Sequence, residues 1–544
     1  MLTLIFLLST LALLAGYRFY GHYLEERFGL DDSRPTPSHT DYDGIDRVPA
    51  HKAVLLGHHF SSIAGAGPIV GPIIAALAFG WLPALLWIVL GAIFIGGVHD
   101  FSSLVASIRH GARSIAEIAK LYMSPVAYKM LLAFIWLSLI YVLVVFTDLT
   151  AETFVSDGGV ASSSLMFMLL AVGFGFSVYR LRMQVAAASA LFVPLVFFAV
   201  WLGQVLPIPA HSIPRLIAGD AAKTWDIFLL AYCFVASTTP VWILLQPRDY
   251  LSSYLLYSSV LAGFCGIVCG GFHAQYPAFN AWSAPQLGAL FPILFITVAC
   301  GACSGFHAVV ASGTSSKQLD RESDARPVAY GAMLIEGLVA VIALATVVML
   351  PRDDALVGKP PLEVYGTGMG RFLGVFGVSP AIGFSFGLLA LSTFILTTLD
   401  TATRLGRYVF EEFFNLKGTR HRYASTLATL VLPAVFVLMT LHDAKGNPIP
   451  AWKAIWPVFG ATNQLLAGLT LLVIAVWLRK TGKGILFVLW PMAFVVGMTV
   501  WALVLLIHSY AFSAIGIIAM VLLALAAVLV WEAFITLRRR ENSP

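Results

Sequence analysis

Long apolar stretches separated by short polar connections run along the chain, and this pattern predicts many membrane-spanning helices. About 20 apolar residues suffice to cross the hydrocarbon core as a helix. The stretches are continuous and do not alternate with period two, which argues against a β-barrel. We expect an all-α polytopic membrane protein with about fifteen spans. They lie near residues 2–19, 54–80, 82–108, 126–147, 165–179, 186–206, 225–245, 251–271, 288–312, 328–350, 376–403, 424–442, 454–478, 486–507 and 511–536.

Composition supports this interpretation. The 544 residues are 59% hydrophobic and only 11% charged, whereas soluble domains carry about 25% charged residues. We expect one transmembrane domain over residues 1–544, with a core at about 54–478 and peripheral helices at 1–20 and 486–537. The formal net charge of +5 is spread over many short loops. The expected partner is therefore the lipid bilayer and not a nucleic acid.

The basic residues predict the orientation. Most of the 33 Lys and Arg fall on one side of the expected spans, in loops such as 18–53, 109–125 and 404–423. Lys and Arg are retained on the cytoplasmic side. The N-terminus, with a retained first span, is then expected to be periplasmic. The C-terminus, with the run Arg538-Arg539-Arg540, is expected to be cytoplasmic.

Two expected spans contain residues that interrupt helices. The first break lies between Gly65 and Pro72, and the second between Cys300 and Thr314. Glycines in such spans can simply allow close helix packing, but packing does not require the two prolines of the first break. Unwound backbone survives in a membrane only inside protein or along a watery cavity. Half-helix N-termini then attract anions, and freed carbonyls bind cations.

The two broken spans run in opposite directions across the membrane. When each broken span is counted as the first, the third span contains or ends in a similar polar segment, at residues 146–151 and 397–402. Two oppositely oriented units that each open with a broken helix are typical of inverted-repeat transporters.

Residues near the breaks are the candidates for substrate binding. A histidine titrates near pH 6.5, which suits proton coupling or carboxylate binding, although a structural role stays open. Three histidines also suit zinc and hence a metal-dependent membrane hydrolase, but neither H-E-x-x-H nor G-x-S-x-G occurs. We therefore expect no metal site and no enzyme. The substrate-binding candidates are His58, His59, Ser61, Gly65, Ala66, Gly67, Ser304, Gly305 and His307.

Ionisable groups within membranes are costly and need a reason. Asp400 is the first candidate for a coupling group, and a fixed ion pair with Arg404 is its alternative. Glu336 is a second candidate proton carrier, or else a carboxyl held neutral by its neighbours. Arg248 and Asp249 are expected to pair with each other at the cytoplasmic end of a span.

Two further pairs carry weaker hypotheses. His99-Asp100 is expected to order the cytoplasmic loop that follows it. Cys300 and Cys303 have C-x-x-C spacing, but without a second pair or a thioredoxin-like context helix packing is the better interpretation.

Several motifs are shared with one known family. They are His58-His59-Phe60 leading into Gly65 to Pro72, Leu245 to Leu251, Ser304 to His307 followed by Ser312 to Gln318, Asp324 to Pro327 with Tyr330 to Met333, Thr398 to Thr401 with Arg404 and Arg407, and Trp456-Pro457 with Phe459-Gly460 and Asn463-Gln464. By these motifs the sequence resembles the carbon starvation (CstA) family.

The resemblance implies a bacterial inner-membrane carrier with a leucine-transporter-type inverted repeat plus extra helices. It implies proton-coupled uptake of pyruvate or, as the alternative, import of short peptides. Residues 397–401 also resemble the eighth core helix of sodium-coupled betaine carriers. By that resemblance Thr397 and Thr398, with carbonyls around Ala64 and Gly65, would bind Na⁺. The coupling ion is thus H⁺ or Na⁺ and no cofactor is implied, whereas the oligomeric state stays open.

Overall fold

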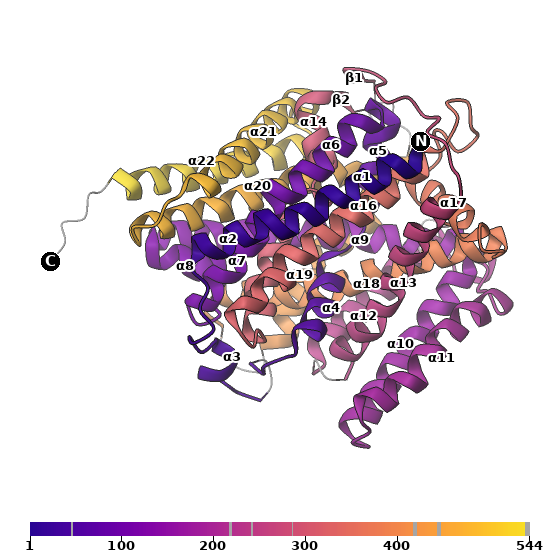
Figure 1. Ribbon diagram of the computed structural model, residues 1–544, viewed down its shortest axis with the longest axis horizontal. Helices are drawn as coiled ribbons and strands as arrows, with labels where there is room; N and C mark the ends of the chain where they lie inside the picture. The colour runs from indigo at the N-terminus through magenta and orange to yellow at the C-terminus, as the bar shows by residue number, and fades with distance from the viewer. Residues whose placement is uncertain are drawn as a thin grey trace.

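The computed structural model describes residues 1–44, 47–216, 220–240, 243–285, 287–416, 421–442 and 448–538 (Figure 1). The expected basic residues Arg539 and Arg540 lie outside this range. The α-helices are α1 (Leu2–Ala15), α2 (Gly21–Phe28), α3 (Pro37–Thr40), α4 (Lys52–Ile63), α5 (Gly67–Phe79), α6 (Trp81–Gly91), α7 (Gly97–Arg109), α8 (Ile115–Tyr122), α9 (Pro125–Ser156), α10 (Gly158–Tyr179), α11 (Val185–Val205), α12 (Ala221–Thr238), α13 (Leu245–Cys269), α14 (Leu290–Thr297), α15 (Gly305–Gly313), α16 (Ala332–Val348), α17 (Pro361–Gly374), α18 (Pro380–Phe413), α19 (His421–Leu438), α20 (Ala451–Lys480), α21 (Leu486–Tyr510) and α22 (Ala514–Arg538).

Short elements complete the fold. Three π-helical turns continue α-helices, namely η1 (Gly16–Tyr20), η2 (Ala92–Gly96) and η6 (Arg326–Gly331), and three 3₁₀ turns are η3 (Ala210–Ser212), η4 (Ser315–Lys317) and η5 (Glu322–Asp324). Two antiparallel hairpins pair β1 (Ser283–Ala284) with β2 (Gly288–Ala289) and β3 (Leu441–His442) with β4 (Pro448–Ile449). They lie in connections, so the interior of the protein is helical.

The expected count of about fifteen spans is not confirmed. Within the described residues, 12 helices are long and apolar enough to cross a membrane, or 13 with the bent pair α4 and α5. The expected spans 225–245 and 288–312 fall on α12 and on α14 with α15. α12 is only 18 residues long and carries Lys223 and Asp226, while α14 and α15 have 8 and 9 residues. Neither segment meets the criterion of one long apolar helix.

The first break has the form that its sequence predicts. Helix α4 ends at Ile63, α5 begins at Gly67, and the two axes differ by 48°. Pro68 stands in the first turn of α5, where a missing N–H costs no helical hydrogen bond. A Cβ on Gly67 would collide with Sγ of Cys300. The glycine therefore lets the first break approach the second.

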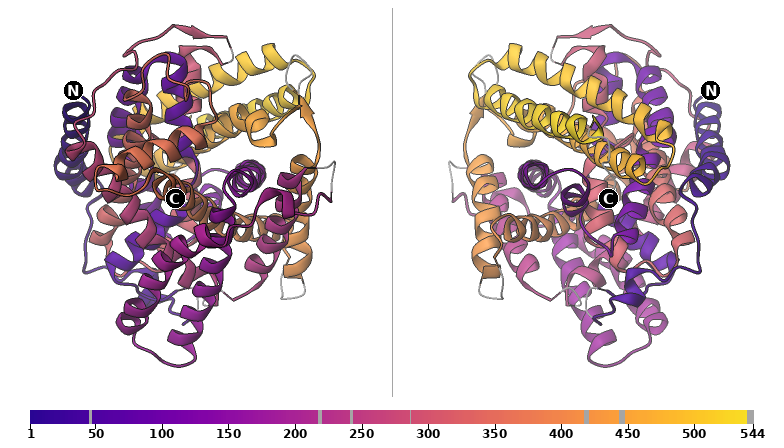
Figure 2. Two further views of the ribbon diagram at one scale, coloured as in Figure 1. Left: turned by 90° about the vertical axis from the view of Figure 1, so that its right-hand side faces the viewer. Right: turned by 90° about the vertical axis from the view of Figure 1, so that its left-hand side faces the viewer.

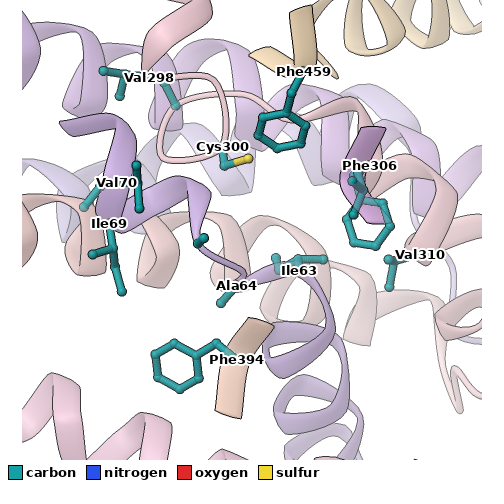
Figure 3. Close-up of a cluster of buried hydrophobic side chains, with 14 of the residues drawn as sticks. Ile63, Ala64, Ile69, Val70, Val298, Cys300, Phe306, Val310, Phe394 and Phe459 are labelled. Carbon is teal, nitrogen blue, oxygen red and sulfur yellow. The ribbon is translucent and has the colours of Figure 1, made fainter. Parts of the chain in front are cut away.

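The second break is longer. Residues 298–304 separate α14 from α15, and the chain turns there through hydrogen bonds from the N–H groups of Ala302 and Cys303 to the carbonyl of Ala299. Apolar side chains from both breaks and from α18 and α20 surround this region, as Ala64, Cys300, Phe394 and Phe459 show in Figure 3. The two breaks thus meet in the interior of the protein.

Helices α9 and α18 pack against each other, and α20 packs against α9. The hairpin of α10 and α11 extends from one end of the molecule, and α21 and α22 cover α20 on the outside (Figure 2). Twelve residues, 349–360, connect α16 to α17, a helix of 14 residues that lies between the expected spans 328–350 and 376–403.

Candidate transport site

A buried guanidinium is the centre of the candidate site. Arg248 lies in the first turn of α13 and is the largest side chain that is fully buried. Its Nη1 forms an ion pair with Asp400 of α18, and its Nη2 donates to Oγ1 of Thr397 at 3.4 Å. A guanidinium is always charged and binds carboxylates with a planar set of donors. Arg248 is therefore a ready carboxylate-binding group at membrane depth.

Tyr232 of α12 completes this centre. Its hydroxyl donates to Oδ2 of Asp400 at 2.7 Å and accepts from Nη1 of Arg248 at 2.5 Å. Oδ1 of Asp400 and Nε of Arg248 have no hydrogen-bond partner among the described residues. The ion pair thus has unused hydrogen-bonding capacity on both members.

The expected ion pair of Arg248 with Asp249 is wrong, and so is the pair of Asp400 with Arg404 that was the alternative to a coupling role. Arg248 does not pair with Asp249; instead Oδ2 of Asp249 lies 3.0 Å from Nδ1 of His58. Arg404 does not pair with Asp400, because its guanidinium donates to the carbonyls of Ala236 and Thr239 at 2.7 and 2.8 Å. These carbonyls lie at the C-terminal end of α12. Backbone carbonyls there have no hydrogen-bond partner within the helix, and together with the helix dipole they favour a cation.

The residues proposed for cation coupling meet at the first break. Thr398 donates through Oγ1 to the carbonyl of Ser62 at 3.3 Å. A Cβ on Gly65 would lie 3.3 Å from that same Oγ1, and Ala64 is fully buried. Thr397 contacts Arg248, as described above. The permanently charged guanidinium of Arg248 therefore lies against Thr397, one of the two threonines to which the resemblance assigns sodium binding.

The histidines before the first break point to different neighbours. His58 contacts Asp249 of α13, whereas Nδ1 of His59 lies 2.7 Å from Oγ of Ser315 in η4. Ser61 donates to the carbonyl of His58 at 3.1 Å. Ala66, which lies within the break, and Gly67, the first residue of α5, are both buried. The predicted substrate-binding residues of the first break thus lie close together, but His58 and His59 each already have a partner within the protein.

Asn463 of α20 stabilises the second break. Its Oδ1 accepts from the backbone N–H of Phe306 at 2.9 Å, and its Nδ2 donates to Oγ of Ser304 at 2.9 Å and to Sγ of Cys300 at 3.2 Å. A Cβ on Gly305 would lie 2.5 Å from the carbonyl oxygen of Asn463. The side-chain amide of Asn463 thus accepts a backbone hydrogen bond at the start of α15, where the sequence predicted that a substrate anion would bind.

His307 lies in a second buried ionic group. Its Nδ1 is 2.7 Å from Oδ2 of Asp100 and its Nε2 is 3.1 Å from Oε2 of Glu336. Asp100 is fully buried and also contacts His99, at 2.7 Å. The expectation that His99 and Asp100 order a surface loop is therefore wrong. Within the described residues, no three His, Cys, Asp or Glu side chains converge as metal ligands.

A cavity of about 300 Å³ opens between α8, α9, α15, α18 and α20. The charged side chains that line it are Arg47, Glu117, Lys317 and Glu412. Its inner wall includes Val309 and Ser312 of α15. The cavity thus reaches the helix that follows the second break.

Sequence reasoning placed Arg248 in an ion pair at the cytoplasmic end of a span and left it out of the candidate site. The available signal was a lone arginine next to a long apolar span, since such groups are rare and need a partner. Tyr232 carried no signal, because a tyrosine in an apolar helix is common at interfaces and in cores.

Known proteins resemble this chain over most of its length. The sequence profile of the carbon starvation protein CstA family matches residues 1–357 and 353–502. Peptide transporter CstA of Campylobacter jejuni is 33% identical over 527 residues, covering 86% of this chain and 74% of the relative. Peptide transporter CstA of Bacillus subtilis is 33% identical over 543 residues, covering 90% and 88%. Pyruvate/proton symporter BtsT of Escherichia coli is 31% identical over 579 residues, covering 91% and 80%.

A solved structure of a manganese transporter from Eremococcus coleocola aligns with 92% of this chain and 99% of its own, at 12% identity and a TM-score of 0.46. The relatives named above are transporters, so this multi-pass protein of the inner membrane is a transporter and not an enzyme. Since the family profile matches well over half of the 544 residues, the chain belongs to the carbon starvation protein CstA family.

Proposed function

We propose that this protein is a secondary transporter that imports a small carboxylate, pyruvate above all, together with a proton. The observation that carries the proposal is the buried ion pair of Arg248 and Asp400 beside the first break. A substrate carboxylate offers Arg248 the same chemistry as Asp400 does. Substrate and Asp400 therefore compete for one guanidinium.

This competition couples substrate to proton. When a substrate carboxylate takes Arg248, Asp400 loses its cation in a site that excludes water. An uncompensated buried carboxylate is costly, so it takes up a proton. The carboxylate and the proton then cross together without net charge. After release of both, Arg248 and Asp400 pair again and the empty carrier reorients.

The same geometry favours H⁺ over Na⁺. Sodium prefers a shell of oxygen ligands, and Thr397 and Thr398 were the predicted hydroxyl ligands. The guanidinium of Arg248 lies 3.4 Å from Oγ1 of Thr397. A monovalent cation placed there would face strong repulsion from this permanent charge.

We further propose a leucine-transporter-type inverted repeat within one transport domain. Each broken span is followed by one long passage (α6 with α7, or α16), one short helix (α8 or α17) and one very long helix. The long helices α9 and α18 have 32 and 34 residues and carry Asp148 and Asp400. With the N-terminus periplasmic and the C-terminus cytoplasmic, the cavity beside α15 faces the cytoplasm.

A short peptide is the alternative substrate, because its C-terminal carboxylate can bind Arg248 in the same way. Relatives from Campylobacter jejuni and Bacillus subtilis are named peptide transporters. A peptide also brings an amino terminus, which needs an anionic or carbonyl partner near the carboxylate site. Asp249, whose Oδ1 has no hydrogen-bond partner among the described residues, is such a group.

Uptake into proteoliposomes tests the proposal. Labelled pyruvate and a labelled dipeptide are each supplied with an inward proton gradient, an inward sodium gradient or no gradient. We expect pyruvate to accumulate with the proton gradient and the sodium gradient to add nothing. Accumulation of the dipeptide alone selects the peptide alternative, and no uptake of either substrate under any gradient sinks the proposal.

A further inference from the structure

A row of four buried titratable side chains crosses the interior beside the second break. His99 and Asp100 come from α7, His307 from α15 and Glu336 from α16, and all four have no exposed surface. Successive contacts of 2.7, 2.7 and 3.1 Å join His99 to Asp100, Asp100 to His307, and His307 to Glu336. The row is separate from Arg248 and Asp400, and the coupling step proposed above does not use it.

The charges in this row do not balance without an added proton. Asp100 and Glu336 both contact the imidazole of His307, and Asp100 has a second imidazole, that of His99, as a neighbour. Glu336 has His307 as its one ionic contact among the described residues. With one proton on His307 and both carboxyls ionised, the row keeps one uncompensated negative charge until it binds a further proton. Neither oxygen of Glu336 accepts a hydrogen bond among the described residues. An unpaired charge that is fully buried is strongly destabilising, so a proton on Glu336 removes an unfavourable charge from this row.

A structural ion pair in the same protein looks different. Glu322 accepts from Nε and Nη2 of Arg109 at 3.2 and 3.0 Å and from the backbone N–H of Asp31 at 3.0 Å. Both of its oxygens are therefore satisfied by permanent donors. Among the described residues Glu336 has no such donors, and its one ionic contact there depends on the protonation of a histidine.

Other titratable groups face the row from the packed elements. His59 of α4 lies within electrostatic range of Asp100 and His307, and its Nε2 has no hydrogen-bond partner among the described residues. The thiols of Cys300 and Cys303 lie within electrostatic range of Glu336 and Asp100, respectively. None of these groups is a permanent cation, so none can replace the missing positive charge.

The row also joins parts that must move against each other in alternating access. His307 follows the second break, whereas Asp100 and Glu336 stand on the unbroken helices α7 and α16. A displacement of α15 by about 1 Å changes a 3.1 Å contact into a broken one. The affinity of Glu336 for a proton therefore depends on the conformation of the broken helices.

We propose that Glu336 and His307 carry a second proton in each transport cycle, in addition to the proton that neutralises Asp400. The inference rests on the proposed function. The proton binds Glu336 from the outer solution and leaves it toward the cytoplasm, with no covalent change in the substrate. One pyruvate anion with two protons moves one net positive charge inward. Uptake is then driven by membrane potential as well as by a pH gradient.

Electrical coupling of pyruvate uptake tests this inference. The purified full chain in liposomes receives labelled pyruvate at equal pH on both sides, with an inside-negative potassium diffusion potential. We expect concentrative uptake by the wild type, with a limit of about 50-fold at about 100 mV for one net charge. Glu336→Gln mimics the permanently protonated group. It should lose uptake driven by potential and keep uptake driven by a pH gradient.

A matched control is Glu532→Gln. Glu532 is a half-buried carboxylate of peripheral helix α22 that accepts from Oγ of Ser124 at 2.7 Å. It should behave as the wild type under both driving forces. Wild-type uptake that ignores the potential, or Glu336→Gln uptake that follows it as the wild type does, overturns the inference.

Two measurements separate this inference from the proposed function. Exchange of labelled for unlabelled pyruvate without any gradient tests only whether the carboxylate is a substrate. Failure of wild-type exchange rejects the proposed function and this inference with it, whereas electroneutral uptake rejects this inference alone. If Glu336→Gln does not fold, the ratio of proton to pyruvate flux in the wild type decides. Two protons per pyruvate support the inference and one overturns it.

Discussion

Asp148 and Asp400 lie in similar Thr/Asp segments of the two longest helices, but their partners differ in kind. Asp148 of α9 accepts from the backbone N–H of Trp452, in the first turn of α20, at 2.7 Å. Asp400 of α18 pairs with the side chain of Arg248, in the first turn of α13. Each aspartate thus meets the beginning of a later helix, in one case through backbone and in the other through a charged side chain.

Under the proposed mechanism, the difference separates a structural contact at Asp148 from a group that takes part in transport, Asp400. A backbone N–H cannot leave its position without unwinding α20, so Asp148 is a fixed helix cap. A guanidinium on a flexible side chain can exchange one carboxylate for another. The comparison therefore predicts that changes around Asp400 alter transport, whereas changes around Asp148 alter mainly stability.

The strongest test of the contrast is the removal of Arg248. Arg248→Ala leaves Asp400 buried without its cation, which costs roughly 3–5 kcal/mol of stability and weakens pyruvate binding at least about 30-fold. The double variant Arg248→Met with Asp400→Asn has no unpaired charge and should regain most of the thermal stability without regaining transport. Thermal unfolding in detergent and pyruvate exchange measure the two effects. Transport by the double variant would contradict the role of Arg248.

Asp400→Asn is expected to have the next largest effect. The guanidinium then lacks a carboxylate in the empty carrier and cannot reorient without substrate. Exchange of pyruvate across the membrane should continue, while net uptake driven by a proton gradient falls to the level of empty liposomes. Unchanged concentrative uptake rules out the competition between Asp400 and substrate.

The sequence predicted the two similar polar segments, and Asp400 as a coupling group, but not this contrast. Broken helices were predictable because Gly65, Pro68 and their neighbours weaken a helix locally. The partner of Asp400 was not, because Arg248 lies 152 positions away and only tertiary packing selects it over Arg404, which is four positions away. The same holds for Asp100 and His307, whose contact joins α7 to α15. The local pattern of residues predicts the helices and their breaks, but it does not predict which charged residues far apart in the sequence pair with each other.

Asp148→Ala sharpens the other half of the comparison. It removes the acceptor of the Trp452 N–H, and a buried donor left without a partner costs about 1–3 kcal/mol. We expect a lower unfolding temperature together with retained uptake by the molecules that stay folded. Asp148→Asn keeps an acceptor oxygen and serves as the matched control. Loss of proton coupling in Asp148→Asn, at wild-type stability, would mean that Asp148 is more than a cap.

Glu152→Gln should have the smallest effect. Oε2 of Glu152, one turn after Asp148, accepts from the indole Nε1 of Trp452 at 2.7 Å. An amide oxygen can take over this hydrogen bond, so only the extra strength of a charged acceptor is lost, about 1 kcal/mol or less. Uptake driven by either a pH gradient or a potential should equal that of the wild type. If instead Glu152→Gln lowers uptake as much as Asp400→Asn does, Glu152 takes part in proton movement. The contact of Asp148 and Glu152 with Trp452 would then have a role in transport and not only in stability.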